Sequence, residues 1–237
     1  PRFIEMNLIS EGKTSIVLGG GVDVERFLPL PEPAGMPVVL FPARMLMDKG
    51  LGTLIEAARI LKETHAVRVV LAGEPDPGNP ATVDASTLQA WQDAGLAEWW
   101  GFQAEMEAVY PQAAVVTLPS LGEGLPTALI EAAACGRAIV ATDVPGCREV
   151  VEDGVNGLLV PPNEPVALAH ALARLLDDAA LRKRMGAAGR QRVMAQFADR
   201  LIIAKIVEIY RRLLPVEKAR LLISREVDPK GGKNGLP

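Results

Sequence analysis

The chain has 237 residues, of which 49% are hydrophobic and 23% are charged, as expected for a domain with an ordinary apolar core. Its net charge of −4 argues against nucleic-acid binding, which normally requires a basic surface. The apolar runs are shorter than the ~20 residues of a membrane-spanning helix. The two cysteines, Cys135 and Cys147, lack a metal-binding spacing and indicate a reducing compartment, so we expect a cytoplasmic protein.

Strand-like and helical segments alternate along most of the chain. We predict strands near 16–19, 37–42, 67–72, 97–100, 113–118, 138–141 and 157–160. The intervening helices are predicted near 50–64, 84–94, 104–110, 127–135, 146–152 and 165–177. This alternation predicts an α/β fold with a Rossmann-like parallel sheet flanked by helices. The Pro/Gly-rich stretch 74–84 is predicted to be a long surface loop, of a kind that often serves a ligand.

The pattern changes after Pro165, where the sequence becomes mostly helical and ends in an amphipathic helix over 199–214. We therefore divide the chain into a short segment at 1–15, a ligand-binding domain at 16–198, a terminal helix at 199–214 and a tail at 215–237. Basic residues on the terminal helix leave a peripheral membrane contact open, although a solvated face is the simpler interpretation.

The most informative stretch is PSLGEGLPTALIEAAACGRAIVAT, residues 119–142. Gly124 to Thr127 place loop backbone and free N–H groups at the start of a helix, which favours a phosphate. Glu123 precedes this turn and Glu131 follows it, and eight helical residues would rise about 12 Å. Two carboxylates at that separation can hold different hydroxyls of one ligand. A phosphate flanked by two polyols describes a nucleotide sugar.

Several ordered blocks resemble the C-terminal, donor-binding domain of retaining glycosyltransferases with the GT-B fold, in the group 1 family. The blocks are GGGVDVERF (19–27), ARMLMDKGL (43–51), VRVVLAGE (67–74), WWGF (99–102), the stretch with the two glutamates and GVNGLLVPP (154–162). The resemblance covers nearly the whole chain from about Ile16 to Leu214.

The resemblance implies a role for each residue of the predicted site. Arg44 and Lys49, at the carboxyl end of a strand, would neutralise the diphosphate, and Glu131 would accept hydrogen bonds from the ribose. Glu123 would lie near the hydroxyls and the anomeric centre of the donor sugar. The helix start at Gly124, Leu125, Pro126 and Thr127 would bind the phosphates, with Pro126 presetting the first turn. Further donor contacts are expected from Gly21 at the phosphate or sugar, from Gly73 and Glu74 near the ribose or base, and from Phe102 and Gln103 near the base.

Each of these positions also has a simpler explanation. Arg44 and Lys49 could be solvated surface cations, Glu131 an exposed helix former, and Glu123 a turn residue. Trp99 and Trp100 are expected to be core aromatics, whereas Arg148 and Glu149 are expected to pack beside the site.

The family resemblance also implies partners. The donor would be a UDP-, GDP- or ADP-sugar, and the acceptor would be held by an N-terminal domain that this chain lacks. Cell-envelope polysaccharide or lipopolysaccharide synthesis is the expected setting. The sequence has no Asp-x-Asp motif, so no metal and no further cofactor are expected. Two alternatives are a non-catalytic nucleotide-sugar-binding module and a GT-B sugar-nucleotide epimerase.

Overall fold

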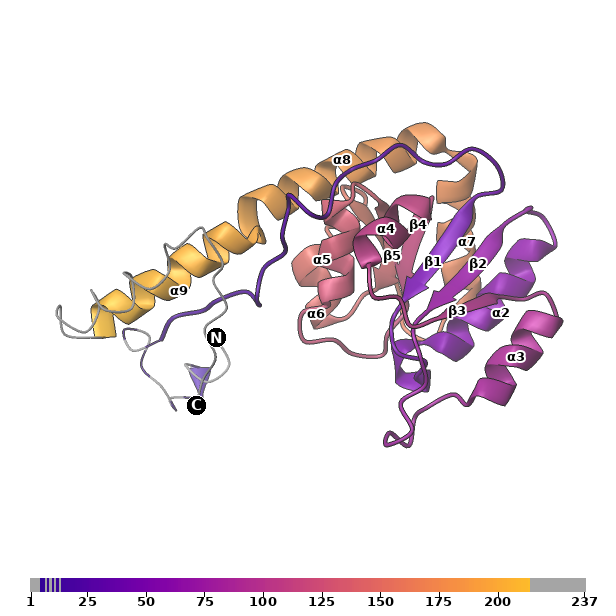
Figure 1. Cartoon of the computed structure of the whole chain (residues 1–237), viewed down its shortest axis with the longest axis horizontal. Helices are drawn as coiled ribbons and strands as arrows, with labels where there is room; N and C mark the ends of the chain where they lie inside the picture. Colours follow the sequence, from indigo (N-terminus) through magenta and orange to yellow (C-terminus); the bar gives the residue numbers. More distant parts are fainter. Residues whose placement is uncertain (1–4, 7, 9, 11, 13, 214–237) are drawn as a thin grey trace, which may run out of the picture.

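The computed structural model describes residues 5, 6, 8, 10, 12 and 14–213 (Figure 1). Most of the predicted segment at 1–15 and all of the predicted tail at 215–237 lie outside these residues. The predicted terminal helix is present as α9, Asp199–Leu213.

The centre of the fold is a six-stranded sheet in the order β3-β2-β1-β4-β5-β6. Its strands are β1 Val38–Pro42, β2 Arg68–Ala72, β3 Glu98–Gly101, β4 Val115–Leu118, β5 Ala138–Thr142 and β6 Gly157–Val160. Every neighbouring pair is parallel. β1, β4 and β5 are buried along their whole length because helices cover both faces of the sheet. The predicted Rossmann-like parallel sheet is confirmed.

The helices are α2 Leu51–Lys62, α3 Ala85–Asp93, α4 Met106–Val109, α5 Thr127–Ala134, α6 Pro145–Val150, α7 Pro165–Asp177, α8 Ala179–Gln196 and α9. Short 3₁₀ turns lie at η2, Met47–Lys49, and η3, Tyr110–Gln112. The predicted helix at 104–110 is therefore shorter than expected and tightens into η3, which contains Pro111. α2 packs against α7, and α5 packs against α8.

The predicted strand at 16–19 is wrong. Residues 14–18 have no regular structure, and Ile16 is 66% exposed. The edges of the sheet are β3 and β6, and this segment pairs with neither of them. Val22, which follows this segment, is instead hydrogen-bonded to the residues just after α8. The Val22 N–H donates to the Phe197 carbonyl at 2.9 Å, and the Asp199 N–H donates to the Val22 carbonyl at 3.0 Å.

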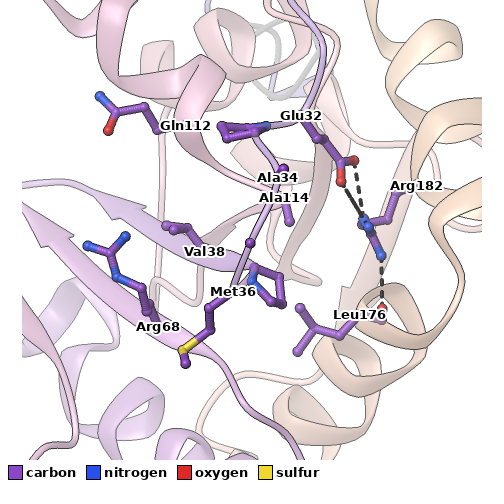
Figure 2. A pocket seen from close by; sticks show the side chains of 12 residues that line it. Glu32, Ala34, Met36, Val38, Arg68, Gln112, Ala114, Leu176 and Arg182 are labelled. Carbon is purple, nitrogen blue, oxygen red and sulfur yellow. Dashed lines mark hydrogen bonds and ion pairs between the residues drawn. The ribbon is translucent and has the colours of Figure 1, made fainter.

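Three arginines form hydrogen bonds with the segment 24–32, which precedes β1. Arg190 donates to the carbonyls of Phe27 at 2.6 Å and Val24 at 2.8 Å, and Arg137 donates to the carbonyl of Leu30. Arg182 pairs with Glu32 at 2.8 Å beside a cavity of about 400 Å³ at the amino ends of the strands (Figure 2). None of the predicted site residues lines that cavity.

The strand order predicts a ligand site at the other end of the sheet. The chain moves outward from β1 through β2 to β3, and then returns to the other side of β1 to form β4, β5 and β6. The loops after β1 and β4 therefore diverge at their carboxyl ends. Open parallel sheets bind ligands in the crevice that such a reversal creates.

The two glycines of α8 allow a test of how closely this helix packs. A Cβ at Gly186 would lie 1.9 Å from the carbonyl oxygen of Gly136, whereas a Cβ at Gly189 would lie 3.4 Å from the nearest atom, the Cβ of Ala133. We expect Gly186→Ala to lower the free energy of unfolding by about 1–3 kcal/mol through overpacking. Gly189→Ala, the matched control, should be neutral or stabilising by up to ~1 kcal/mol, because Ala is the better helix former. Urea unfolding measures both. Equal stability of the two variants would contradict this packing.

Candidate functional site

The loops that follow β1 and β4 are joined to each other directly. The Leu121 N–H donates to the carbonyl of Asp48 at 2.9 Å. Gly50 lies against Pro119, so close that a Cβ would be 1.8 Å from the Pro119 carbonyl oxygen, and its φ is +78°. Glycine is required here both by the contact and by the left-handed backbone. The sequence Lys-Gly therefore brings Lys49 to the loop that carries Glu123.

Lys49 and Glu123 form a largely buried ion pair. Lys49 Nζ lies 2.7 Å from Glu123 Oε1, and their side chains are 22% and 10% exposed. The buried Ser120 hydroxyl donates to the same oxygen at 2.6 Å. Among the described residues no donor reaches Glu123 Oε2. One oxygen of the carboxylate is therefore held by the protein, and the other can accept a hydrogen bond from a ligand.

The start of α5 offers unpaired backbone donors. Pro126 is the N-cap residue, and its carbonyl accepts from the N–H groups of Leu129 and Ile130. Within the described part of the chain, no protein acceptor faces the amides of Gly124, Leu125 and Thr127. Free amides at a helix start are suited to an anion.

A cavity of about 520 Å³ opens beside α5, at the carboxyl ends of β1, β2 and β3. Arg44 lies at its mouth, 60% exposed, and pairs with Asp76 at 2.5 Å. Phe102, a large apolar residue, is 71% exposed here. Six of the predicted site residues line this one cavity: Arg44, Gly73, Glu74, Phe102, Gln103 and Glu131.

Glu131 is half-buried in the wall of this cavity and is held by Tyr110, whose hydroxyl donates to Glu131 Oε2 at 2.8 Å. Burial raises the pKa of Glu131, an effect opposed by the Tyr110 hydrogen bond and by the charge of Arg26. Burial also raises the pKa of Tyr110 well above its usual value, so the phenol remains a donor.

Gly21 lies apart from this cavity. Its backbone packs against Asp199, at the start of α9, although the neighbouring Gly19 approaches the side chain of Leu125. The structure therefore brings the 19–21 loop to one side of the α5 start without placing Gly21 among the cavity residues. Its contact with a donor stays a prediction.

Sequence reasoning missed the residues that support the site. Ser120, Tyr110 and Asp76 each hold a predicted site residue, and the indole N–H of Trp99 donates to the Gly73 carbonyl at 2.8 Å. Hydroxyl and indole groups within apolar runs carry no spacing signal, so these partners could be found only in three dimensions.

Two features are absent from the residues that the structure describes. No three His, Cys, Asp or Glu side chains gather there in an arrangement that could hold a metal ion. In the same residues, no helix is both long and apolar enough to cross a bilayer.

Residues 36–178 match the family described as "Glycosyl transferases group 1". The α-maltose-1-phosphate synthase of Mycolicibacterium smegmatis is 33% identical over 210 residues, which are 84% of this chain and 51% of that protein. The C-terminal domain of a glycosyl transferase group 1 family protein (LpcC) from Francisella tularensis is 25% identical, with a TM-score of 0.64 over 75% of this chain and 99% of that one.

Anabaena HepE in complex with UDP and glucose shares the fold, with a TM-score of 0.72 at 24% identity over 81% of this chain and 55% of that one. The chain spans about half the length of the curated relatives it matches.

The ion pair between the two loops can be tested by a double-mutant cycle. Lys49→Met leaves a largely buried carboxylate without its cation, and Glu123→Gln leaves the ammonium without its anion. We expect each single variant to lose about 1–3 kcal/mol of unfolding free energy, and the double variant to lose less than the sum.

The matched control is the exposed Arg59–Glu56 pair, whose side chains are 54% and 59% exposed. Arg59→Met with Glu56→Gln should show a coupling of less than about 0.5 kcal/mol. Urea unfolding of all variants measures both couplings. A coupling between Lys49 and Glu123 as small as that of the control would show that the pair does not join the loops.

Proposed function

Because the chain belongs to the glycosyl transferases group 1 family and has the fold of the C-terminal domain of GT-B glycosyltransferases, we propose that it binds a nucleotide-diphospho-sugar as the donor for glycosyl transfer. The acceptor would be held by an N-terminal domain, since the curated relatives are about twice as long as the matched region.

The observation that carries this proposal is the order of groups along the chain at the start of α5. The free amides of Gly124, Leu125 and Thr127 lie between Glu123, which pairs with Lys49, and Glu131, which lines the cavity. A nucleoside in the cavity would bring its ribose to Glu131 and its diphosphate to the amides. The sugar would then reach Glu123 Oε2. A cavity of about 520 Å³ is within the usual range for small-molecule sites.

The same arrangement suits the departure of a nucleoside diphosphate. When the bond between the anomeric carbon and the diphosphate oxygen breaks, negative charge grows on that oxygen. Lys49, Arg44 and the amides of Leu125 and Thr127 would stabilise this charge, as groups oriented before the reaction do most effectively. The anomeric carbon would form its new bond to an acceptor hydroxyl, whose proton would pass to the departing diphosphate oxygen. Transfer with retention of the anomeric configuration is part of the proposal.

The HepE structure, which contains UDP and glucose, supports a nucleoside diphosphate as the ligand, with UDP the first choice among UDP, GDP and ADP. Glu74 and Phe102, which line the same cavity, would contact the base.

Thermal unfolding with added nucleotides tests this proposal. We expect UDP, GDP or ADP, or one of their sugars, to raise the Tm, because a ligand at 100 times its Kd stabilises the native state by about 2.7 kcal/mol.

Lys49→Ala should weaken binding roughly 10-fold or more, through loss of a charge-assisted contact. Lys183→Ala, an exposed position on α8, should bind as the wild type does. If none of the nucleotides shifts the Tm, the donor site is wrong.

Binding should also depend on pH through Glu131. Burial raises the pKa of this carboxyl, so it protonates at a higher pH than an ordinary glutamate and then loses acceptor capacity for the ribose diol. Affinity should be full above this raised pKa and fall as the pH drops through it. Glu131→Gln cannot titrate, so the ratio of wild-type to variant affinity for UDP should approach one at low pH. Calorimetry between about pH 8 and pH 5 measures that ratio. Titration of the ligand's phosphates affects both proteins equally and therefore does not change the ratio. A ratio that does not change with pH would show that Glu131 does not contact the ligand.

A further inference from the structure

Tyr110 is completely enclosed, yet its polar end points at the ligand site. The residue begins η3, just before Pro111, and is 1% exposed. Its ring contacts that of Phe27, with centroids 6.1 Å apart. The hydroxyl donates to Glu131 Oε2, and both residues line the 520 Å³ cavity.

We propose that Tyr110 is a positioning residue, which fixes the carboxylate of Glu131 so that its second oxygen faces the ribose and the site distinguishes ribonucleotides from 2′-deoxyribonucleotides. This inference rests on the proposed function, in which Glu131 binds the ribose.

The argument begins with the freedom of a glutamate side chain. The final torsion of glutamate is broad and roughly two-fold, so an unsupported carboxylate samples many orientations. A buried phenol that donates to Oε2 selects one of them. Within the described residues no hydrogen bond to Oε1 is made, so this oxygen can accept from a ligand in the cavity that Glu131 lines. A site with an oriented acceptor prefers a ligand that carries the matching hydroxyl, because a ligand without that hydroxyl leaves the carboxylate oxygen unpaired.

No other side chain in the described residues does this for Glu131. Arg26, whose charge also acts on Glu131, donates instead to Glu107 at 2.7 Å and is 52% exposed. Glu107, the other charged group that acts on Glu131, is an acid and repels it. The hydroxyl of Tyr110 is therefore the protein donor that sets the orientation of Glu131.

Tyr110→Phe tests the proposal, because it keeps the ring and its contact with Phe27 and removes only the donor. Calorimetry should compare UDP, GDP and ADP with their 2′-deoxy forms. We expect the wild type to prefer the ribonucleotide by roughly 5–30-fold, the range of a hydrogen bond worth 1–2 kcal/mol. Tyr110→Phe should lose most of this preference and remain folded at the temperature of the measurement, with a Tm somewhat below that of the wild type because Glu131 loses its donor. Tyr210→Phe, which removes an exposed phenol on α9, is the matched control and should retain the preference.

Two more measurements show whether Tyr110 acts through Glu131. The variant Glu131→Gln should lose the preference, and the double variant with Tyr110→Phe should lose nothing further. The pH at which UDP binding weakens should rise in Tyr110→Phe, because the hydrogen bond that lowers the pKa of Glu131 is gone.

The outcomes separate this inference from the function on which it rests. A wild type that binds ribo- and deoxyribonucleotides equally would show that Glu131 does not bind the ribose. A preference that is lost in Glu131→Gln but intact in Tyr110→Phe would overturn the positioning role alone. Equal loss of both ligands in Tyr110→Phe, with an unchanged pH profile, would also overturn it, because a general packing defect has that effect.

Discussion

The site depends on one constraint, the junction of the loops after β1 and β4. The loop after β1 leads toward β2 on one side of the sheet, whereas the loop after β4 leads toward β5 on the other side. The two loops therefore diverge unless contacts join them. The joint consists of a backbone hydrogen bond from Leu121 to Asp48, the close contact of Gly50 with Pro119 and the Lys49–Glu123 ion pair. Because Lys49 belongs to this joint, the cation proposed to contact the diphosphate is positioned by the same contacts that shape the crevice.

The two glutamates of the site follow a common pattern. Glu123 has one oxygen held by Lys49 and Ser120, and Glu131 has one oxygen held by Tyr110. Burial of a carboxylate is costly unless it is hydrogen-bonded, and in each case the protein meets that cost for one oxygen. A ligand with hydroxyl groups at both ends of a diphosphate could satisfy the remaining oxygens.

The fold was largely predictable because its signals are local. Continuous apolar runs gave the strands at 67–72 and 113–118, and the turn at Gly124–Thr127 gave the start of α5. The prediction of a strand at 16–19 was wrong because a short apolar run carries no information about whether the fold brings it beside another strand. Lys49 and Glu123 were predicted separately from their motifs, but their contact joins residues 74 positions apart. Ser120 and Tyr110 were not predicted, since a hydroxyl becomes functional only through the partner that the fold brings to it.

Several side chains around the site are exposed, as the proposed second domain would require. Phe102 and Arg44, which line the same cavity, are 71% and 60% exposed, and Met47 and Leu121, near the junction of the loops after β1 and β4, are 53% and 44% exposed. Exposed apolar side chains beside a ligand site are available for contact with another domain. Small-molecule sites usually bury most of the ligand surface, and one open wall cannot do so. A donor bound to this chain alone would therefore keep one face in water. Closure by the proposed acceptor domain would exclude that water and strengthen the interactions of Lys49 and the α5 amides with the diphosphate, because charges interact more strongly in a medium of lower dielectric constant.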